Sequence, residues 1–248
     1  MRLMGIRCAG LGFCTALALV HPAVLRAEDV AHVLGVAIDR SELSAAEGDP
    51  AAALGKLYDR VWNAVSRHYI EQNGLAATGA EIAEALAYHR EFERKDRAQR
   101  ARKLEELDRR LAAGELADGE RARIEEFRAT LARLAQSDLE SDRAPPPDPE
   151  RQAAQHAQWI EIWKMNRALY EQYGGIVALT RFGPFPHGAR VALLEDYERR
   201  GLLRFSDAQQ RERLFALLAT RPSMVLAPGQ VDFTPFWKRP IPPSYFPD

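Results

Sequence analysis

The chain contains almost no cysteine. Its two cysteines, Cys8 and Cys14, both lie in an N-terminal segment that we expect to be removed. The remaining chain, from Glu28 onward, therefore has none. A disulfide framework, a thiol nucleophile and a cysteine metal site are excluded for that part of the chain.

An excess of charge of one sign is also missing. The 248 residues include 34 Lys and Arg against 35 Asp and Glu. No surplus of positive charge is available to neutralise phosphates, so we predict no nucleic-acid partner. With 46% hydrophobic and 28% charged residues, the composition also excludes a wholly disordered chain and a polytopic membrane protein.

The short motifs of common enzymes and cofactor sites are absent. The sequence has no H-E-x-x-H, G-x-S-x-G, G-x-x-x-x-G-K-[ST] or G-x-G-x-x-G, which mark zinc proteases, serine hydrolases and nucleotide-binding folds. The histidines beyond the N-terminal segment are scattered: His32, His68, His89, His156 and His187. We predict no catalytic residue, no metal site and no cofactor, and an enzyme is the less favoured alternative.

Residues 1 to 27 have the pattern of an export signal. Arg2 and Arg7 form a basic start, and no charged residue follows between Cys8 and Leu25. The apolar centre of this stretch, residues 11 to 20, is short. It suits translocation better than spanning a membrane, because a spanning helix needs about 20 predominantly apolar residues. We predict a cleaved signal peptide and a periplasmic or secreted protein, with an uncleaved membrane anchor as the alternative.

The segment from residue 28 to 89 combines a short β-prone start with helical periodicity. Apolar residues between residues 54 and 69 follow spacings that place them on one helical face. Asn73-Gly74 predicts the end of this helix. Thr78, with Glu81 three residues later, is a capping-box signature that predicts the start of the next.

Residues 90 to 143 are strongly charged, with 28 charged residues among 54. Their apolar residues form a narrow stripe that is interrupted at Ala113-Gly114 and Asp118-Gly119. The pattern predicts an arm of two antiparallel helices that bury this stripe against each other. The arm is either a solvated spacer or a functional clamp, and it offers a surface for a homodimer.

The C-terminal part, residues 144 to 221, begins with a proline-rich break. Asp148 and Pro149 then predict the start of a helix that runs to Tyr173. Residues 176 to 182 predict a short strand and residues 183 to 186 a turn.

Two more helices are expected to complete the core. The second of them is predicted to be capped by Ser206 with Gln209. The tail, residues 222 to 248, contains seven prolines and five aromatic residues, which predicts an extended segment. It either packs on the surface or presents its aromatic side chains to a partner.

Residues 30 to 43, VAHVLGVAIDRSEL, resemble the opening of the SurA/PpiC/PrsA family of exported foldases. The N-terminal chaperone domain of that family typically begins V-x-x-V-N-G-x-x-I-x-R-x-E-L. The matching residues are Val30, Val33, Gly35, Ile38, Arg40, Glu42 and Leu43. Leu34 stands where the family usually has Asn. The similarity extends to residue 90 or so, a minor part of the chain.

This resemblance implies a SurA-like helical chaperone domain. Together with the residue patterns described above, it predicts a mostly α fold with a long charged helical hairpin and short β elements. It also implies that unfolded or extended client polypeptides bind in an apolar groove. The parvulin domain of the enzymatic family members is not visible, so isomerase activity is not carried over. Six aromatic residues are candidates for lining the groove: Tyr58, Trp62, Tyr69, Trp159, Trp163 and Tyr170. At helical spacing each of them could equally be a core residue. A structural protein that uses the arm and tail to bind a dedicated partner is the alternative.

Overall fold

A computed structural model describes residues 29–44, 49–114, 116–180 and 183–243. The predicted signal peptide, residues 1 to 27, lies outside these ranges. The described chain is mostly helical, as the sequence predicts. Its helices are α1 (Arg40–Ser44), α2 (Pro50–Gln72), α3 (Gly79–Ala113), α4 (Asp118–Arg143), α5 (Pro149–Tyr173), α6 (His187–Arg199) and α7 (Ala208–Ala219). Its strands are β1 (Asp29–Val33), β2 (Val36–Asp39), β3 (Ala178–Thr180), β4 (Gly183–Phe185) and β5 (Leu203–Phe205), and the tail carries two short 3-10 helices, η1 (Pro228–Gln230) and η2 (Phe236–Lys238).

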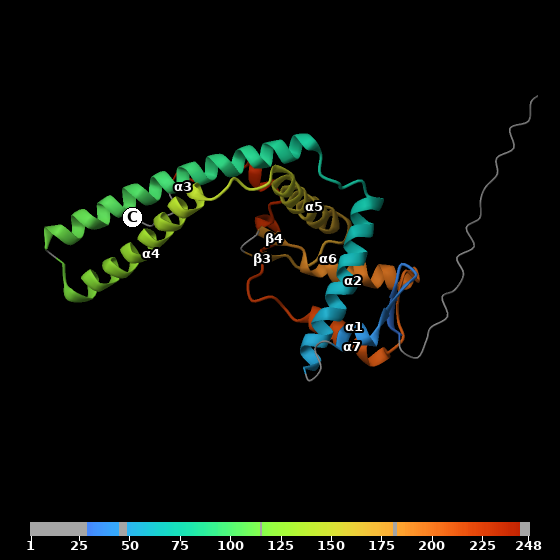
Figure 1. The fold of residues 1–248 in the computed structure, drawn as a ribbon. Helices are drawn as coiled ribbons and strands as arrows, with labels where there is room; N and C mark the ends of the chain where they lie inside the picture. Colours follow the sequence, from blue (N-terminus) through green and yellow to red (C-terminus); the bar gives the residue numbers. More distant parts are fainter. Residues whose placement is uncertain (1–28, 45–48, 115, 181–182, 244–248) are drawn as a thin grey trace, which may run out of the picture.

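The N-terminal strands and a strand near residue 204 meet in a small antiparallel sheet of order β2-β1-β5. Strands β1 and β2 form a hairpin whose turn has positive φ at Leu34 (53°) and Gly35 (83°). On its other side β1 pairs with β5, where Ala31 lies opposite Phe205. Segments from the N-terminal part and the C-terminal half of the sequence therefore build one helical body, which lies opposite the arm in Figure 1.

The core of the body forms around one face of α2. Leu57, Val61, Val65 and Tyr69 recur every four residues and are all buried, which confirms the helical face that the sequence predicts. They belong to one hydrophobic cluster with buried residues of β1, α5, α6 and β5. Residues far apart in sequence thus hold the body together, and α7 also packs on α2.

The charged segment forms a long arm that projects from the body (Figure 1). Helix α3 starts at the predicted capping box, in which the Glu81 N–H donates to Thr78 Oγ1 and the Thr78 N–H donates to the Glu81 carboxylate. It continues through residue 90 without a break and ends at Gly114, whose φ is 77°. Helix α4 then returns along it.

A separate hydrophobic cluster holds the arm together. Leu107, Ile124 and Leu131 are buried between α3 and α4. Ion pairs cross between the two helices, including Arg97 with Asp142 at 2.7 Å and Arg110 with Glu120 at 2.8 Å. The central part of the narrow apolar stripe is therefore covered by the partner helix within the same chain, while Leu134 and Leu139 of α4 remain exposed.

Helix α5 leads back to the body and carries the tail. Asp148 caps α5 as predicted, because its side chain accepts a hydrogen bond from the Glu150 N–H. Strand β3 lies within the predicted strand segment, but residues 183 to 185, which were expected to form a turn, form β4 instead. The tail first bonds to β3, with the Leu179 N–H donating to Met224 O at 3.1 Å, and its η2 then packs on α3.

Candidate functional site

The six aromatic residues that the sequence singles out lie on α2 and α5, but the structure distributes them over several environments. Tyr58 and Trp62 pack beside α6. Tyr69 lies where α2, α5 and α6 meet, and Trp163 and Tyr170 face the tail. Trp159 is 39% exposed and contacts His156, with ring centroids 5.1 Å apart. The structure therefore does not bring all six together in one groove.

The first environment surrounds the guanidinium group of Arg190, and we call it the Arg190 cluster (Tyr58, Trp62, Phe185 and Arg190). The Arg190 Cζ lies 3.5 Å from the ring centroid of Trp62 and 4.4 Å from that of Phe185. Tyr58 stacks on Trp62 with an interplanar angle of 17°. The faces of aromatic rings attract cations, so the rings stabilise the guanidinium, by about 0.5 to 2 kcal/mol for each such contact.

The Arg190 cluster holds a positive charge without a carboxylate. Within the described ranges, no hydrogen bond or ion pair involves the Arg190 side chain, and its Nε is enclosed without a partner. Burial lowers the pKa of Arg190 to about 10, so the group stays charged at neutral pH. Burial also raises the pKa of Tyr58, so that its hydroxyl stays protonated.

The second environment is a polar cavity of about 170 Å³ between the C-terminal parts of α2, α5 and α6. The Tyr69 hydroxyl donates to Gln172 Oε1 at 2.7 Å, and the Tyr197 hydroxyl bonds to His68 Nδ1 at the same distance. Burial raises the pKa of Tyr69 and Tyr197 to about 12. These hydroxyls are protonated and already hydrogen-bonded to neighbouring helices. They therefore connect α2 with α5 and α6 and are not available to a ligand.

The third environment binds the tail, and we call it the tail-binding face (Tyr88, Gln99, Trp163 and Tyr170). The buried Trp163 donates from Nε1 to the main-chain oxygen of Phe233 at 3.1 Å. The rings of Tyr170 and Phe233 lie 5.4 Å apart. The expected packing of the tail on the surface is thus observed at these residues.

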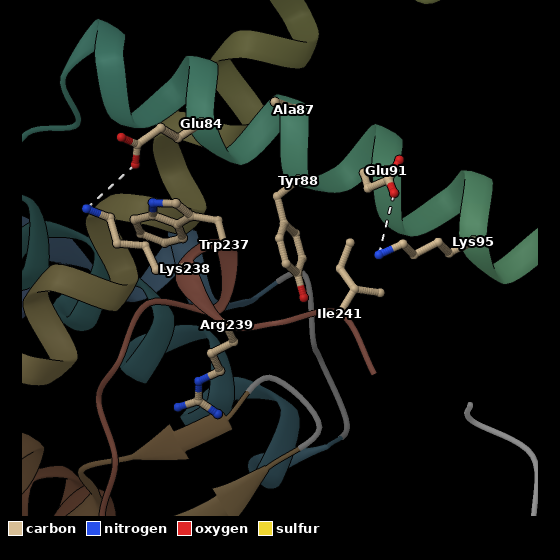
Figure 2. A pocket seen from close by; sticks show the side chains of 9 residues that line it. All are labelled: Glu84, Ala87, Tyr88, Glu91, Lys95, Trp237, Lys238, Arg239 and Ile241. Carbon is tan, nitrogen blue, oxygen red and sulfur yellow. Dashed lines mark ion pairs between the residues drawn. The ribbon is translucent and has the colours of Figure 1, made fainter. Parts of the chain in front are cut away.

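Further along, the tail follows α3 toward the arm. Tyr88 contacts Phe236 with ring centroids 5.9 Å apart. The buried Gln99 donates from Nε2 to the main-chain oxygen of Pro243 at 2.7 Å. An open cavity of about 640 Å³ lies between α3 and the tail, and Figure 2 shows Tyr88, Trp237 and Ile241 at its edge. An ion pair between the tail and α3 flanks it, Lys238 with Glu84 at 3.7 Å.

Sequence reasoning missed half of the side chains that form the Arg190 cluster and the tail-binding face. Arg190 and Phe185 were not singled out, because no local pattern places them beside Trp62, far away in sequence. Tyr88 and Gln99 were also missed. Gln99 is uncharged within a run of charged residues, and that is the one local signal that could have marked it.

The described residues contain no group of three or more His, Cys, Asp or Glu side chains arranged to hold a metal ion. Within the same ranges, no helix is both long enough and apolar enough to cross a membrane. Comparison of the chain with protein-family models, with curated proteins and with solved structures gives no match. The functional conclusion therefore rests on the geometry of the site and on the N-terminal resemblance.

Proposed function

We propose that the protein is an exported, chaperone-like protein that binds extended polypeptide at the tail-binding face and has no isomerase activity. The observation that carries this proposal is the way in which the face holds the tail. Gln99 and Trp163 both donate hydrogen bonds to main-chain oxygens of the tail, at 2.7 and 3.1 Å. Main-chain oxygens are present in every polypeptide, so donors of this kind can bind many sequences.

The chemistry of the tail matches this mode of binding. Pro240, Pro242 and Pro243 favour an extended conformation whose carbonyl groups are not bonded within the segment. Grooves lined by aromatic side chains bind such segments, because the segment loses little conformational entropy on binding. In this proposal the tail occupies the client site within its own chain, and a client replaces it.

The N-terminal resemblance supports the same proposal. The family motif has Asn-Gly where this chain has Leu34-Gly35, and both residues here have positive φ at the turn of the β1–β2 hairpin. Asn-Gly is the preferred pair for such a turn, so the motif and the observed backbone agree. The resemblance also implies that distant C-terminal segments complete the chaperone domain, and β5 and α7 pack on β1 and α2 in that manner.

Release of the tail in the full chain tests the proposal. The double substitution Phe233→Ala with Trp237→Ala removes two tail rings that pack around α3 and α5. We expect this variant to suppress the aggregation of reduced insulin in a light-scattering assay, at stoichiometric ratio, several-fold more strongly than the wild type. It should also bind a labelled peptide of residues 231 to 243 in trans.

A matched control shows whether the loss of any two apolar side chains has the same effect. Val36 and Leu217 are 69% and 49% exposed and lie outside the tail-binding face, so Val36→Ala with Leu217→Ala should leave suppression unchanged. Adding Gln99→Ala to the tail-released variant should weaken peptide binding. If the tail-released variant is folded by circular dichroism but neither suppresses aggregation nor binds the peptide, the proposal is wrong.

A further inference from the structure

The Arg190 cluster shares no residue with the tail-binding face, and its guanidinium combines an enclosed, unpartnered Nε with aromatic neighbours. Several other arginines have carboxylate partners, such as Arg167 with Glu171 at 2.8 Å and Arg211 with Glu198 at 2.6 Å. The Arg190 guanidinium instead lies over aromatic rings, with its Cζ 3.5 and 4.4 Å from the centroids of Trp62 and Phe185. An enclosed cation without an anion is unfavourable, and aromatic faces compensate for only part of that cost.

A second nitrogen beside Arg190 also lacks a partner. His187 lies three residues before Arg190, on the same side of the first turn of α6. Its Nε2 is enclosed without a hydrogen bond, as is Arg190 Nε. The ring of His187 lies 6.5 Å from that of Phe185, so both nitrogens belong to one small region.

The helix itself adds to the positive potential of this region. The first turn of α6 contains no acidic residue, and its N-cap, Pro186, makes no side-chain capping bond. The N-terminal end of a helix carries a partial positive charge that favours a nearby anion. Arg190 is half-buried rather than sealed, so part of the side chain is accessible from the surface.

From these observations we infer that the Arg190 cluster binds a carboxylate group next to an apolar or aromatic group of a ligand. The planar guanidinium donates two parallel hydrogen bonds to a carboxylate, and its aromatic neighbours fix its orientation. The rings of Tyr58, Trp62 and Phe185 then contact the apolar neighbour of that carboxylate. A phosphate dianion fits less well, because one arginine among apolar rings supplies too little positive charge to replace its water.

A carboxylate of this kind can come from the C-terminus of a peptide or from an acidic side chain. Calorimetric titration of the full-length protein with three tripeptides distinguishes these sources. The probes are acetyl-Ala-Leu-Phe with a free carboxylate, the same peptide as an amide, and acetyl-Ala-Asp-Phe-amide. We expect at least one carboxylate peptide to bind at least tenfold more tightly than the neutral amide, as charge-assisted hydrogen bonds provide.

Two substitutions then test the residue itself. Arg190→Met should reduce the affinity for the carboxylate peptide at least tenfold, and Arg190→Lys should restore only part of it, because lysine lacks the planar fork. Arg167→Gln removes an exposed, paired arginine of α5 and should leave binding unchanged. Circular dichroism shows whether each variant is folded.

Three results would overturn the inference: equal binding of the acid and amide peptides, full affinity in a folded Arg190→Met protein, or no binding of either carboxylate peptide at millimolar concentration. The test is independent of the proposed function, because Arg190→Met should not alter binding of the peptide of residues 231 to 243 to the tail-released variant. Failure at one site therefore leaves the other site standing.

Discussion

Arg190 and Arg211 both lie over aromatic rings, yet their charges are balanced differently. Arg211 lies 4.7 Å from the ring centroid of Phe215 and donates from Nε and Nη2 to Glu198, at 2.6 and 2.7 Å. These hydrogen bonds raise the pKa of Arg211, whereas burial lowers that of Arg190 to about 10. The same residue type thus forms a structural contact in one place and leaves donors for a ligand in the other.

Glu81 is the residue for which the structure predicts a clear pH dependence. Burial alone would raise its pKa, but hydrogen bonds from Thr78 and Lys164 outweigh burial and lower it below 4.5. A carboxyl group whose pKa is lower in the folded state stabilises the fold above its unfolded value, near 4.5, and this contribution is lost as the pH falls through the folded pKa. We therefore expect Glu81→Gln to destabilise the protein at pH 7, by less than about 1 kcal/mol because the pair with Lys164 is still partly accessible to solvent.

Urea unfolding of the wild type and Glu81→Gln at pH 7 and near pH 3 measures this effect. The difference in free energy of unfolding between the two proteins should shrink at the acidic pH, because the wild-type carboxylate is then becoming protonated. A difference that stays the same at both pH values would contradict the prediction.

Local residue patterns were sufficient to predict the contacts of Glu81 but not those of Arg190. The capping box needs only two residues three positions apart, Thr78 and Glu81, and the structure confirms it. The partners of Arg190 come from α2 and β4, and no local spacing reports that contact. The family resemblance marked position 34 as unusual. The structure shows why it matters, since Leu34 has a φ of 53°, which favours Asn over Leu.

Among the elements, α6 depends on one glycine at its start. A Cβ added to Gly188 would lie 2.8 Å from the Ile176 nitrogen and 3.2 Å from the Gly175 Cα. The Gly188 N–H donates to Ile176 O at 3.0 Å, so the two backbones are in direct contact. Gly188→Ala should therefore push α6 away and destabilise the protein by about 1 to 3 kcal/mol, measured by thermal or urea unfolding.

Gly119, in the first turn of α4, provides the matched control. A Cβ at Gly119 would meet nothing within 4 Å, and its φ does not favour glycine. Gly119→Ala should leave stability unchanged or raise it by about 0.4 to 1 kcal/mol, because alanine restricts the unfolded chain. Equal unfolding midpoints for Gly188→Ala and the wild type would mean that the contact between the two backbones is not tight.

The boundaries of the elements could be predicted where a local signal sets them. Gly114 and Asp148 end and begin helices as expected. The cap of α7 was expected at Ser206, but the side chain that accepts the capping bonds is Asp207. The reason is tertiary: the Ser206 N–H donates to Val30 O at 3.0 Å and so continues the pairing of β5 with β1.

At the scale of the whole molecule, the arm and the body have separate cores. Leu107 is buried in the arm cluster and Leu57 in the body cluster. The arm helices pack mainly on each other, while α3 also contacts α5 and η2 near the body. A defect in the arm core should therefore remain in the arm.

Leu107→Ala tests this independence. Removal of a fully enclosed leucine costs about 2 to 5 kcal/mol, and the cost should fall on the arm alone. Hydrogen exchange should show lost protection in α4 and the C-terminal half of α3, with α2 and α6 unchanged. The matched substitution Leu57→Ala should instead lower protection in α2 and α6 and leave α4 unchanged. Loss of protection throughout the molecule in Leu107→Ala would show that the two cores unfold together.

The fate of the tail was the largest question that the sequence left open. Its prolines predicted an extended segment, but packing on the surface and presentation to a partner were both compatible with its aromatic residues. The answer depends on Trp163 and Gln99, which reach the tail from two different helices. No sequence periodicity links either of them to residues 233 and 243.

The position of β1 between β2 and β5 has a consequence for biogenesis. The arm is one continuous stretch of sequence, so its helices can pair as soon as they leave the ribosome or a translocation pore. Strand β1 is among the first described segments to emerge, but its second edge stays open until Leu203 has followed. The arm can therefore fold while one edge of β1 is still unpaired. This topology requires that the unpaired edge of β1 is protected from pairing with other chains during synthesis.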